Sequence, residues 1–187
     1  MMNRLLKGKK VWLRPPKTED FEEFTAMNKA SRKFHSGLAN PPIDHKSFDG
    51  FLLRNEHDSN ESFLICRRND DAIAGMINLS QIFRGNFQNA YLGYYVGAKF
   101  AGKGFMTEAI DLILRFAFKQ LKLHRIEANV QPQNLSSLTV LRKNGFTKEG
   151  FSRRYLKISK RWRDHERWAI IAEEWEKHLK SKKVNGK

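Results

Sequence analysis

Residues 94–109 read YYVGAKFAGKGFMTEA, an extended apolar run that passes through a glycine-containing loop into an amphipathic segment. The backbone N–H groups of such a loop, and of the first turn of the helix after it, have no acceptors within the helix, and the helix dipole adds positive potential. Glycine lets an anion approach the main chain closely. The loop therefore predicts a binding site for a phosphate group.

The patterns on either side of this loop predict a mixed α/β fold. Three runs rich in apolar residues, at 62–67, 73–82 and 90–96, indicate an antiparallel meander of strands. Apolar residues recur at helical spacing over 104–120, and an extended run follows at 124–130. A strand, a helix and a strand in this order predict a parallel pair joined by a crossover.

The remaining predicted elements are shorter. We expect Thr18 to cap a first helix, and Asn134 to cap a short helix that ends at Asn144-Gly145. The other expected elements are an edge strand over 11–14, a helix over 44–55, and two final strands over 151–158 and 162–171. From about residue 177 the basic end is expected to be frayed. No repeat or linker is found, which predicts one domain over 1–187.

The chain has 35 Lys and Arg residues against 20 Asp and Glu, a net charge of +15. Such a surplus attracts nucleic acids, anionic membranes and acidic ligands alike, so it does not indicate which of them the protein binds. The single Cys66 lies in an apolar run, so we expect a buried thiol and a reducing compartment. Without a secretory signal or an apolar span, the sequence predicts a cytoplasmic protein with no membrane partner.

The glycine loop lacks two common phosphate-binding patterns. It contains neither Gly-x-x-x-x-Gly-Lys-Ser/Thr nor a full Gly-x-Gly-x-x-Gly, which disfavours mononucleotide kinases and Rossmann enzymes. Residues 99–104, KFAGKG, instead resemble the pyrophosphate-binding pattern Gln/Arg-x-x-Gly-x-Gly/Ala of the GNAT superfamily of N-acetyltransferases. Lys99 departs from the usual first residue, and the departure removes one possible side-chain contact to the cofactor.

A second block of sequence supports this resemblance. HRIEANV at 124–130, NLSS at 134–137 and LRKNGF at 141–146 are similar to the strand, the Asn-x-x-Ser and the terminal Gly-Phe of the RimJ and RimL branch, the ribosomal-protein-alanine N-acetyltransferases. Residues 79–94 and the WRDH of 162–165 resemble the RimJ side of that branch. The resemblance covers roughly residues 73–168.

The resemblance implies a mostly antiparallel central sheet with one splayed parallel strand pair, flanked by helices, and transfer of an acetyl group from acetyl-CoA without a metal. The pantetheine arm would lie between the splayed strands. The implied cofactor contacts are Tyr95, Val96, Lys99, Ala101, Gly102, Lys103, Gly104, Phe105, Met106, Thr107, Asn134 and Ser137. Contacts to the acceptor are expected from Ser80, Arg84 and Tyr155.

The sequence matches the family's catalytic residues less fully than its cofactor-binding residues. Many family members protonate the leaving thiolate with a Tyr, but Leu141 stands at that position, and the RimL-like pattern assigns this role to Ser137. A first-turn hydroxyl such as Ser137 can also simply bond locally, and Asn134 can be a plain N-cap. Glu127 and Asn129 share a strand face, where Glu127 either relays a proton through water or forms an ion pair with Arg125.

A site without a clear base favours an acceptor that is already neutral. At pH 7.5 roughly a third of protein α-amines are neutral, against about one lysine in a thousand. The sequence therefore predicts acetylation of a protein N-terminus, by the resemblance that of a ribosomal protein. A small-molecule acceptor (polyamine, amino sugar or amino acid) and a non-catalytic ribosome- or RNA-binding module remain alternatives. Association with ribosomal RNA through the basic tail at 180–187 is a further expectation.

Overall fold

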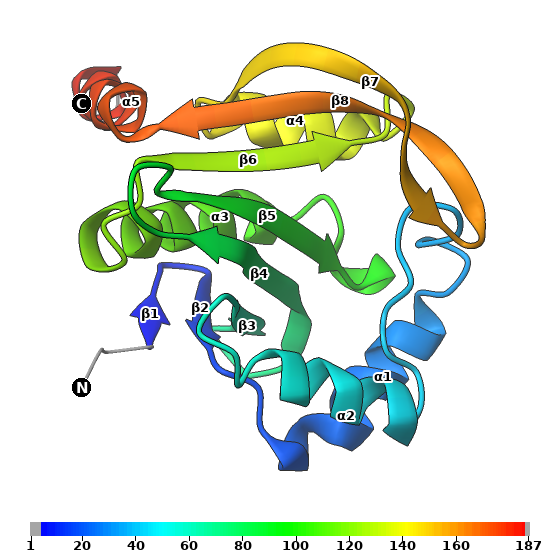
Figure 1. The fold of residues 1–187 in the computed structure, drawn as a ribbon. Helices are drawn as coiled ribbons and strands as arrows, with labels where there is room; N and C mark the ends of the chain where they lie inside the picture. Colours follow the sequence, from blue (N-terminus) through cyan, green and yellow to red (C-terminus); the bar gives the residue numbers. More distant parts are fainter. Residues whose placement is uncertain (1–4, 186–187) are drawn as a thin grey trace.

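The fold is built on one sheet of eight strands in the order β1-β2-β3-β4-β5-β6-β8-β7 (Figure 1). The computed structural model describes the backbone of residues 5–185 and the side chains of residues 5–182. The strands are β1 Leu6–Lys7, β2 Val11–Arg14, β3 Glu61–Arg67, β4 Ile73–Phe83, β5 Asn89–Val96, β6 Arg125–Val130, β7 Thr147–Ile158 and β8 Arg161–Ile171. All neighbours pair antiparallel except β5 and β6, which are parallel. This confirms the predicted mixed sheet.

Helices cover both faces of the sheet. They are α1 Phe21–Ala30, α2 His45–Arg54, α3 Phe105–Arg115, α4 Leu135–Lys143 and α5 Ala172–Asn185, and a π-helical turn, Phe116–Gln120, continues α3. Tyr94 and Tyr95 are consecutive on β5 and so point to opposite faces. Tyr94 contacts α4 through Ser137, whereas the Tyr95 ring lies near Phe24 of α1. Across residues 5–185, no helix has the length and apolar character needed to span a membrane.

Most predicted elements lie within a residue or two of the observed ones, but the N-terminal details differ. β2 is not an edge strand, because β1 pairs with its outer side. Thr18 does not cap α1 but begins a short 3-10 turn, Thr18–Asp20, since the Asp20 carboxylate accepts the Lys17 N–H and closes that turn. β7 begins at Thr147, four residues before the predicted start, because it pairs with β8 from there on.

The C-terminal segment is helical where the sequence predicted a frayed end. Trp175 of α5 is only 2% exposed and lies against Phe118, with ring centroids 5.2 Å apart. Leu179, one turn later, packs on the same core. These apolar contacts extend the helix beyond residue 177 despite its basic surface. Of the predicted basic tail, the side chains of 183–185 and all of residues 186–187 lie outside the described residues.

Cys66 is fully buried on β3, as predicted. Burial raises the pKa of its thiol to about 11. The thiol therefore stays protonated at neutral pH and acts as a core side chain rather than a nucleophile.

A single carboxylate fixes the start of α3 to the β1–β2 turn. Glu108 accepts hydrogen bonds from the backbone N–H groups of Lys9, Lys10 and Val11 at 2.8, 2.7 and 2.8 Å. A Cβ on Gly8 would lie 2.8 Å from the Val11 carbonyl oxygen and 2.7 Å from the Glu108 Cδ, so any other residue here would force the turn to shift. Because Glu108 lies in the first turn of α3, these bonds also hold the glycine loop that precedes the helix.

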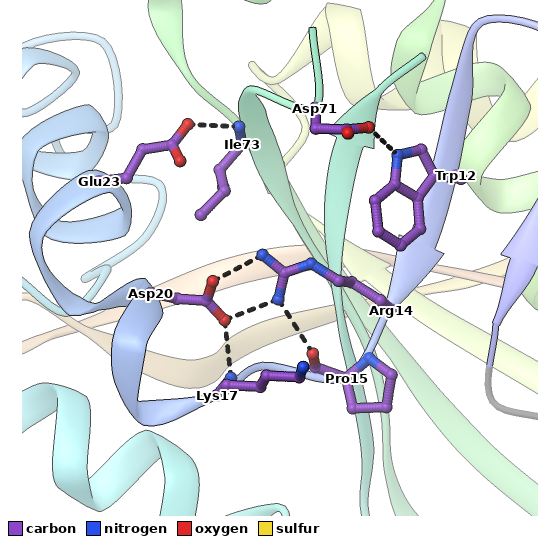
Figure 2. Close-up of polar contacts among 8 residues, drawn as sticks. All are labelled: Trp12, Arg14, Pro15, Lys17, Asp20, Glu23, Asp71 and Ile73. Atoms are coloured by element: carbon purple, nitrogen blue, oxygen red, sulfur yellow. Dashed lines mark hydrogen bonds and ion pairs between the residues drawn. The ribbon is translucent and has the colours of Figure 1, made fainter.

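An ion pair plays the corresponding role at the start of α1 (Figure 2). Both terminal guanidinium nitrogens of Arg14 on β2 donate to Asp20 at 2.7 and 2.6 Å. The two side chains are only 20% and 10% exposed. Glu23 of α1 then accepts the backbone N–H of Ile73 at 2.7 Å, so that α1 is tied to both β2 and β4.

We predict that Asp20→Ala destabilises the fold, because it leaves the half-buried Arg14 cation without its partner. The loss should be about 3 kcal/mol, or about 6–12 °C in melting temperature for a chain of this size. Asp70→Ala is the matched control, since it removes an exposed pair with Arg67 and should leave the melting temperature nearly unchanged. Thermal unfolding followed by circular dichroism measures both, and equal shifts would contradict the prediction.

Candidate functional site

The parallel strands β5 and β6 pair over only three residues and then part. The registered pairs are Asn89 with Arg125, Ala90 with Ile126 and Tyr91 with Glu127. Beyond Tyr91, β5 stays paired with β4 as far as Val96, and β6 stays paired with β8 as far as Val130. Each strand therefore has one edge without a strand partner, as the predicted splayed pair requires.

A cleft of about 530 Å³ opens along the parted end of β5 and runs past the glycine loop to α4. Ten of the twelve predicted cofactor contacts line it, namely Tyr95, Val96, Ala101, Gly102, Gly104, Phe105, Met106, Thr107, Asn134 and Ser137. The ammonium groups of Lys99 and Lys103 lie instead over the Phe100 ring, 4.8 and 5.9 Å from its centroid. No carboxylate is among the described residues that line the cleft, which suits an anionic ligand.

The glycine loop has the backbone that its sequence predicts. Gly102 and Gly104 have φ values of +75° and +80°, in the left-handed region where other residues are strained. Gly104 directly precedes α3, whose first N–H groups have no acceptor within the helix. A second cleft shares Gly104, Thr107 and Lys143 with the first and adds the cations of Lys10 and Lys182. The carboxylates that line it are already engaged, Asp111 by Arg115 and Glu108 by the N–H groups of the β1–β2 turn. Free backbone donors and nearby cations together fit a ligand that carries phosphates.

Ser137 has a partner that the sequence did not reveal. Its hydroxyl lies 2.6 Å from the Tyr94 hydroxyl, and its N–H donates to the capping Asn134 Oδ1 at 3.2 Å. Burial raises the pKa of Tyr94, which keeps its phenol protonated. Leu141, where many relatives carry a Tyr, is fully buried in the core. A phenol thus reaches Ser137 from β5, and the two residues are too far apart in sequence for any local pattern to pair them.

On the opposite face of the sheet, Glu127 is engaged in an ion pair. Its Oε1 accepts from the Arg125 Nε at 2.9 Å and from the Asn89 Nδ2 at 3.3 Å. Arg125 also binds Glu149 with both terminal nitrogens. These contacts favour the ion-pair interpretation of Glu127 over a role as base. Asn129, two residues along, has a buried Oδ1 that accepts no hydrogen bond from the described residues.

His165, of the WRDH motif, lies on this same face. Asn129 pairs with Arg167 on β8, and His165 is two residues before Arg167, so all three side chains point to one side of the sheet. The His165 ring is buried, and its Nδ1 lies 3.0 Å from the Arg163 carbonyl. A carbonyl only accepts, so Nδ1 carries the proton and Nε2 keeps its lone pair. Burial lowers the pKa of His165, which favours this neutral form.

A second histidine supports the parted end of β5. His35 is buried, and its Nε2 donates to the Val96 carbonyl at 2.9 Å. Its ring packs edge-on against Tyr95, with centroids 5.2 Å apart. His35 therefore satisfies a main-chain acceptor that β6 would satisfy in a continuous sheet.

The three predicted acceptor contacts do not lie together. Ser80 pairs with Tyr91 at the point where the strands part, and Tyr155 lies beside His165 with ring centroids 6.2 Å apart. Arg84 follows the end of β4, at the opposite end of β5 from Val96, and donates to the Leu121 carbonyl at 2.5 Å. The structure brings Ser80 and Tyr155 to the His165 face, and it does not bring Arg84 to the cleft.

Sequence comparison decides the family. The profile described as "Acetyltransferase (GNAT) domain" matches residues 10–147. The chain belongs to the GNAT acetyltransferases. It is 39% identical over 175 residues, 89% of this chain and 97% of the relative, to the "Probable N-acetyltransferase YjcK" of Bacillus subtilis strain 168. It is also 42% identical over 103 residues, 55% of this chain and 53% of the relative, to the "[Ribosomal protein uS5]-alanine N-acetyltransferase" of Escherichia coli K12.

Structure comparison agrees with this assignment. The structure of Mycobacterium smegmatis RimJ in complex with CoA-disulfide matches this acetyltransferase with a TM-score of 0.82 and 29% identity, over 95% of this chain and 91% of that one. Enzymes of this family use acetyl-CoA as the acetyl donor. The positive-φ glycines, the free N–H groups of α3 and the carboxylate-free cleft fit such a ligand.

We predict that Gly102→Val weakens acetyl-CoA binding at least about tenfold, since a β-branched residue at this φ costs about 1–3 kcal/mol of backbone strain. A Cβ at Gly102 would meet no protein atom within 4 Å, so the expected effect comes from the backbone and the ligand rather than from a clash. Calorimetric titration with acetyl-CoA measures the affinity.

Gly85→Val provides the control for this substitution. Gly85 has a φ of +68° with open space around its Cβ position, and it lies at the opposite end of β5 from the cleft. The control should lose similar stability but retain its affinity for acetyl-CoA. Unchanged affinity in a folded Gly102→Val protein would remove the phosphate-loop assignment.

Proposed function

We propose that this acetyltransferase transfers the acetyl group of acetyl-CoA to the N-terminal α-amine of a protein in the cytoplasm, and that the whole chain acts as one catalytic domain. A ribosomal protein is the proposed acceptor, in line with the uS5-directed relative. The observation that carries the proposal is the neutral, buried His165. Burial lowers the pKa of this histidine and keeps it neutral, so that it can take a proton. An α-amine, with a pKa near 7.7–8.0, gives up a proton to such a base far more readily than a lysine or polyamine amine near 10.4.

In the proposed mechanism, the residues on the His165 face prepare the acceptor. The Asn129 Oδ1, which lacks a partner among the described residues, accepts an N–H of the incoming amine. The His165 Nε2 takes the proton that the amine must lose. A backbone N–H on the unpaired edge of β5 donates to the acetyl carbonyl oxygen, where negative charge develops as the amine attacks.

Ser137 and Tyr94 serve the departing thiolate from the other face. Ser137 gives its hydroxyl proton to the sulfur and regains one from solvent. Tyr94, 2.6 Å away, orients the serine hydroxyl. Because burial raises the pKa of Tyr94, a lasting tyrosinate is disfavoured, and its role is one of positioning rather than of net proton supply.

The charges of the site argue against a polyamine acceptor. A polycation requires carboxylates along its path, and none is among the described residues of the cleft. Glu127 and Glu149, on the other face, are both bound to Arg125. The charges of the site do not argue against an amino sugar or an amino acid, which remains the second candidate acceptor. A purely non-catalytic RNA-binding module would have no use for the arrangement of Ser137 and His165.

A panel of acceptors tests the proposal. Short peptides with a free N-terminal alanine should be acetylated, while spermidine and the same peptides with a blocked N-terminus and one lysine should react at least about tenfold more slowly. Glucosamine, in the same panel, tests the second candidate. Release of CoA and mass spectrometry of the products measure this. Ser137→Ala is the inactive reference, and its turnover should fall more than its acetyl-CoA affinity. Preference for spermidine or the amino sugar would overturn the proposed acceptor.

The role of His165 predicts a change in pH dependence. His165→Gln should reduce turnover of an α-amine peptide by about 10²-fold at pH 7, the usual size of a general-base effect. Because the lowered pKa keeps His165 neutral through this range, the loss should shrink toward pH 9, where the amine is neutral without help. His124→Gln, which alters an exposed histidine beside Glu173, should leave the pH profile unchanged. An equal loss at every pH would show a structural role instead.

A further inference from the structure

The outer part of the β7–β8 hairpin carries an unusual charge. Residues 151–163 read FSRRYLKISKRWR, with six Lys and Arg and no Asp or Glu. These 13 residues alone contribute six of the 15 net positive charges of the chain. The proposed catalytic groups do not account for this concentration of charge.

The cations of this outer hairpin, residues 151–163, are free to meet a partner. Arg153, Arg154, Lys157, Lys160 and Arg161 are all exposed. None of the five forms an ion pair with a carboxylate of the described residues. Nearer the core, Lys148 of the same hairpin forms an ion pair with Glu166. The outer hairpin therefore concentrates five exposed cations that have no carboxylate partner among the described residues.

Large apolar side chains are interspersed with these cations. Trp162 is 60% exposed and Phe151 49%, while Leu156 is also exposed. Across the ribbon, Lys157 pairs with Trp162 and Leu156 pairs with Arg163, and the two pairs point to opposite faces. Each face therefore combines a cation with an apolar or aromatic group.

We infer that the outer hairpin is a binding surface for single-stranded or looped RNA. Lysine and arginine neutralise phosphates, and exposed aromatic rings stack on bases that are not paired. An anionic membrane requires an apolar face separated from a basic one, whereas here both faces are mixed. An acidic peptide would satisfy the cations but would leave Trp162 and Phe151 without a matching surface.

The position of the outer hairpin relates it to the cleft (Figure 1). Its tip is joined to the loop after α1, where the Ser159 Oγ donates to the Asn40 Oδ1 at 2.9 Å. Leu38 and Ala39 of that loop line the cleft, and the Gln131 side chain donates to the Gly37 carbonyl at 2.7 Å. RNA bound to the outer hairpin would therefore lie next to the acceptor side. This inference extends the proposed function, because a protein N-terminus presented on a ribonucleoprotein would reach the enzyme together with RNA.

Binding of a fluorescently labelled 20-nucleotide RNA of mixed sequence, followed by anisotropy across a salt series, tests the inference. The intact chain should bind with an affinity that falls steeply with salt. Lys157→Gln with Arg161→Gln should weaken binding about tenfold or more and lower the salt slope by about 1.4, as expected for two lost phosphate contacts on a single strand. Trp162→Ala should weaken binding about tenfold with the slope unchanged, because stacking releases no counterions.

Lys177→Gln with Lys180→Gln is the matched control, since it removes the same charge from the exposed surface of α5. It should retain most of the affinity. An equal loss in this control would assign binding to net charge or to the C-terminal helix and overturn the inference. Absence of RNA binding by the intact chain at low salt, or tighter binding to phosphatidylglycerol vesicles or to polyglutamate, would overturn it as well.

Peptide acetylation by the same variants separates this inference from the proposed function. The hairpin variants should acetylate a free short peptide at the rate of the unaltered enzyme, because the changed residues are neither cleft-lining residues nor proposed acceptor contacts. Loss of RNA binding with full peptide turnover supports both conclusions. If the intact enzyme acetylates the peptide but binds no RNA, only the RNA-binding role of the outer hairpin is refuted. If it binds RNA but does not acetylate the peptide, only the proposed acceptor is refuted.

Discussion

The parting of β5 and β6 after three residue pairs is the constraint on which the site depends. Parallel strands that separate leave main-chain N–H and C=O groups without their usual partners, and such groups are costly to bury unsatisfied. Part of that cost is offset by side chains, since His35 donates to the Val96 carbonyl and Ser31 accepts the Ala98 N–H. The remaining groups form an edge that an amide-containing ligand arm can complete. The opening in the sheet and the candidate ligand site thus share the same main-chain groups.

The two faces of this opening have different chemistry because consecutive strand residues point in opposite directions. The Tyr94 side holds hydroxyl groups and meets α4, which begins at a capped, positively polarised end. The other side holds a buried amide and a neutral histidine. A donor and an acceptor that enter from opposite faces would therefore meet different groups, without any large rearrangement of the backbone.

The parts of this protein that could be predicted from sequence are those set by near neighbours. The strand runs, the helix at 104–120 and the loop around Gly102 follow from periodicity and from glycine, whose conformations are local properties. Other features depend on contacts between segments that are distant in sequence, which local patterns do not predict. These are the contact between the Tyr94 and Ser137 hydroxyls, the bonds of the Glu108 carboxylate and the placement of His165. The sequence does not predict the helical C-terminal segment for a similar reason, because Trp175 contacts Phe118 only in the folded chain. The expectation for Arg84 rests on resemblance alone, and only the direction of β4 shows how far this residue lies from Val96.

The attachment of Glu108 to the β1–β2 turn affects whether this site could be transferred to another protein. The segment that binds phosphate in such folds is often regarded as a self-contained strand, loop and helix. Here the first turn of the helix is held by the amides of residues 9–11, which lie 97 to 99 residues earlier in the sequence than Glu108. Grafting residues 94–115 onto another sheet would therefore transfer the glycines without the anchor that orients them. Shuffling of this loop between proteins would succeed only when the first hairpin travels with it.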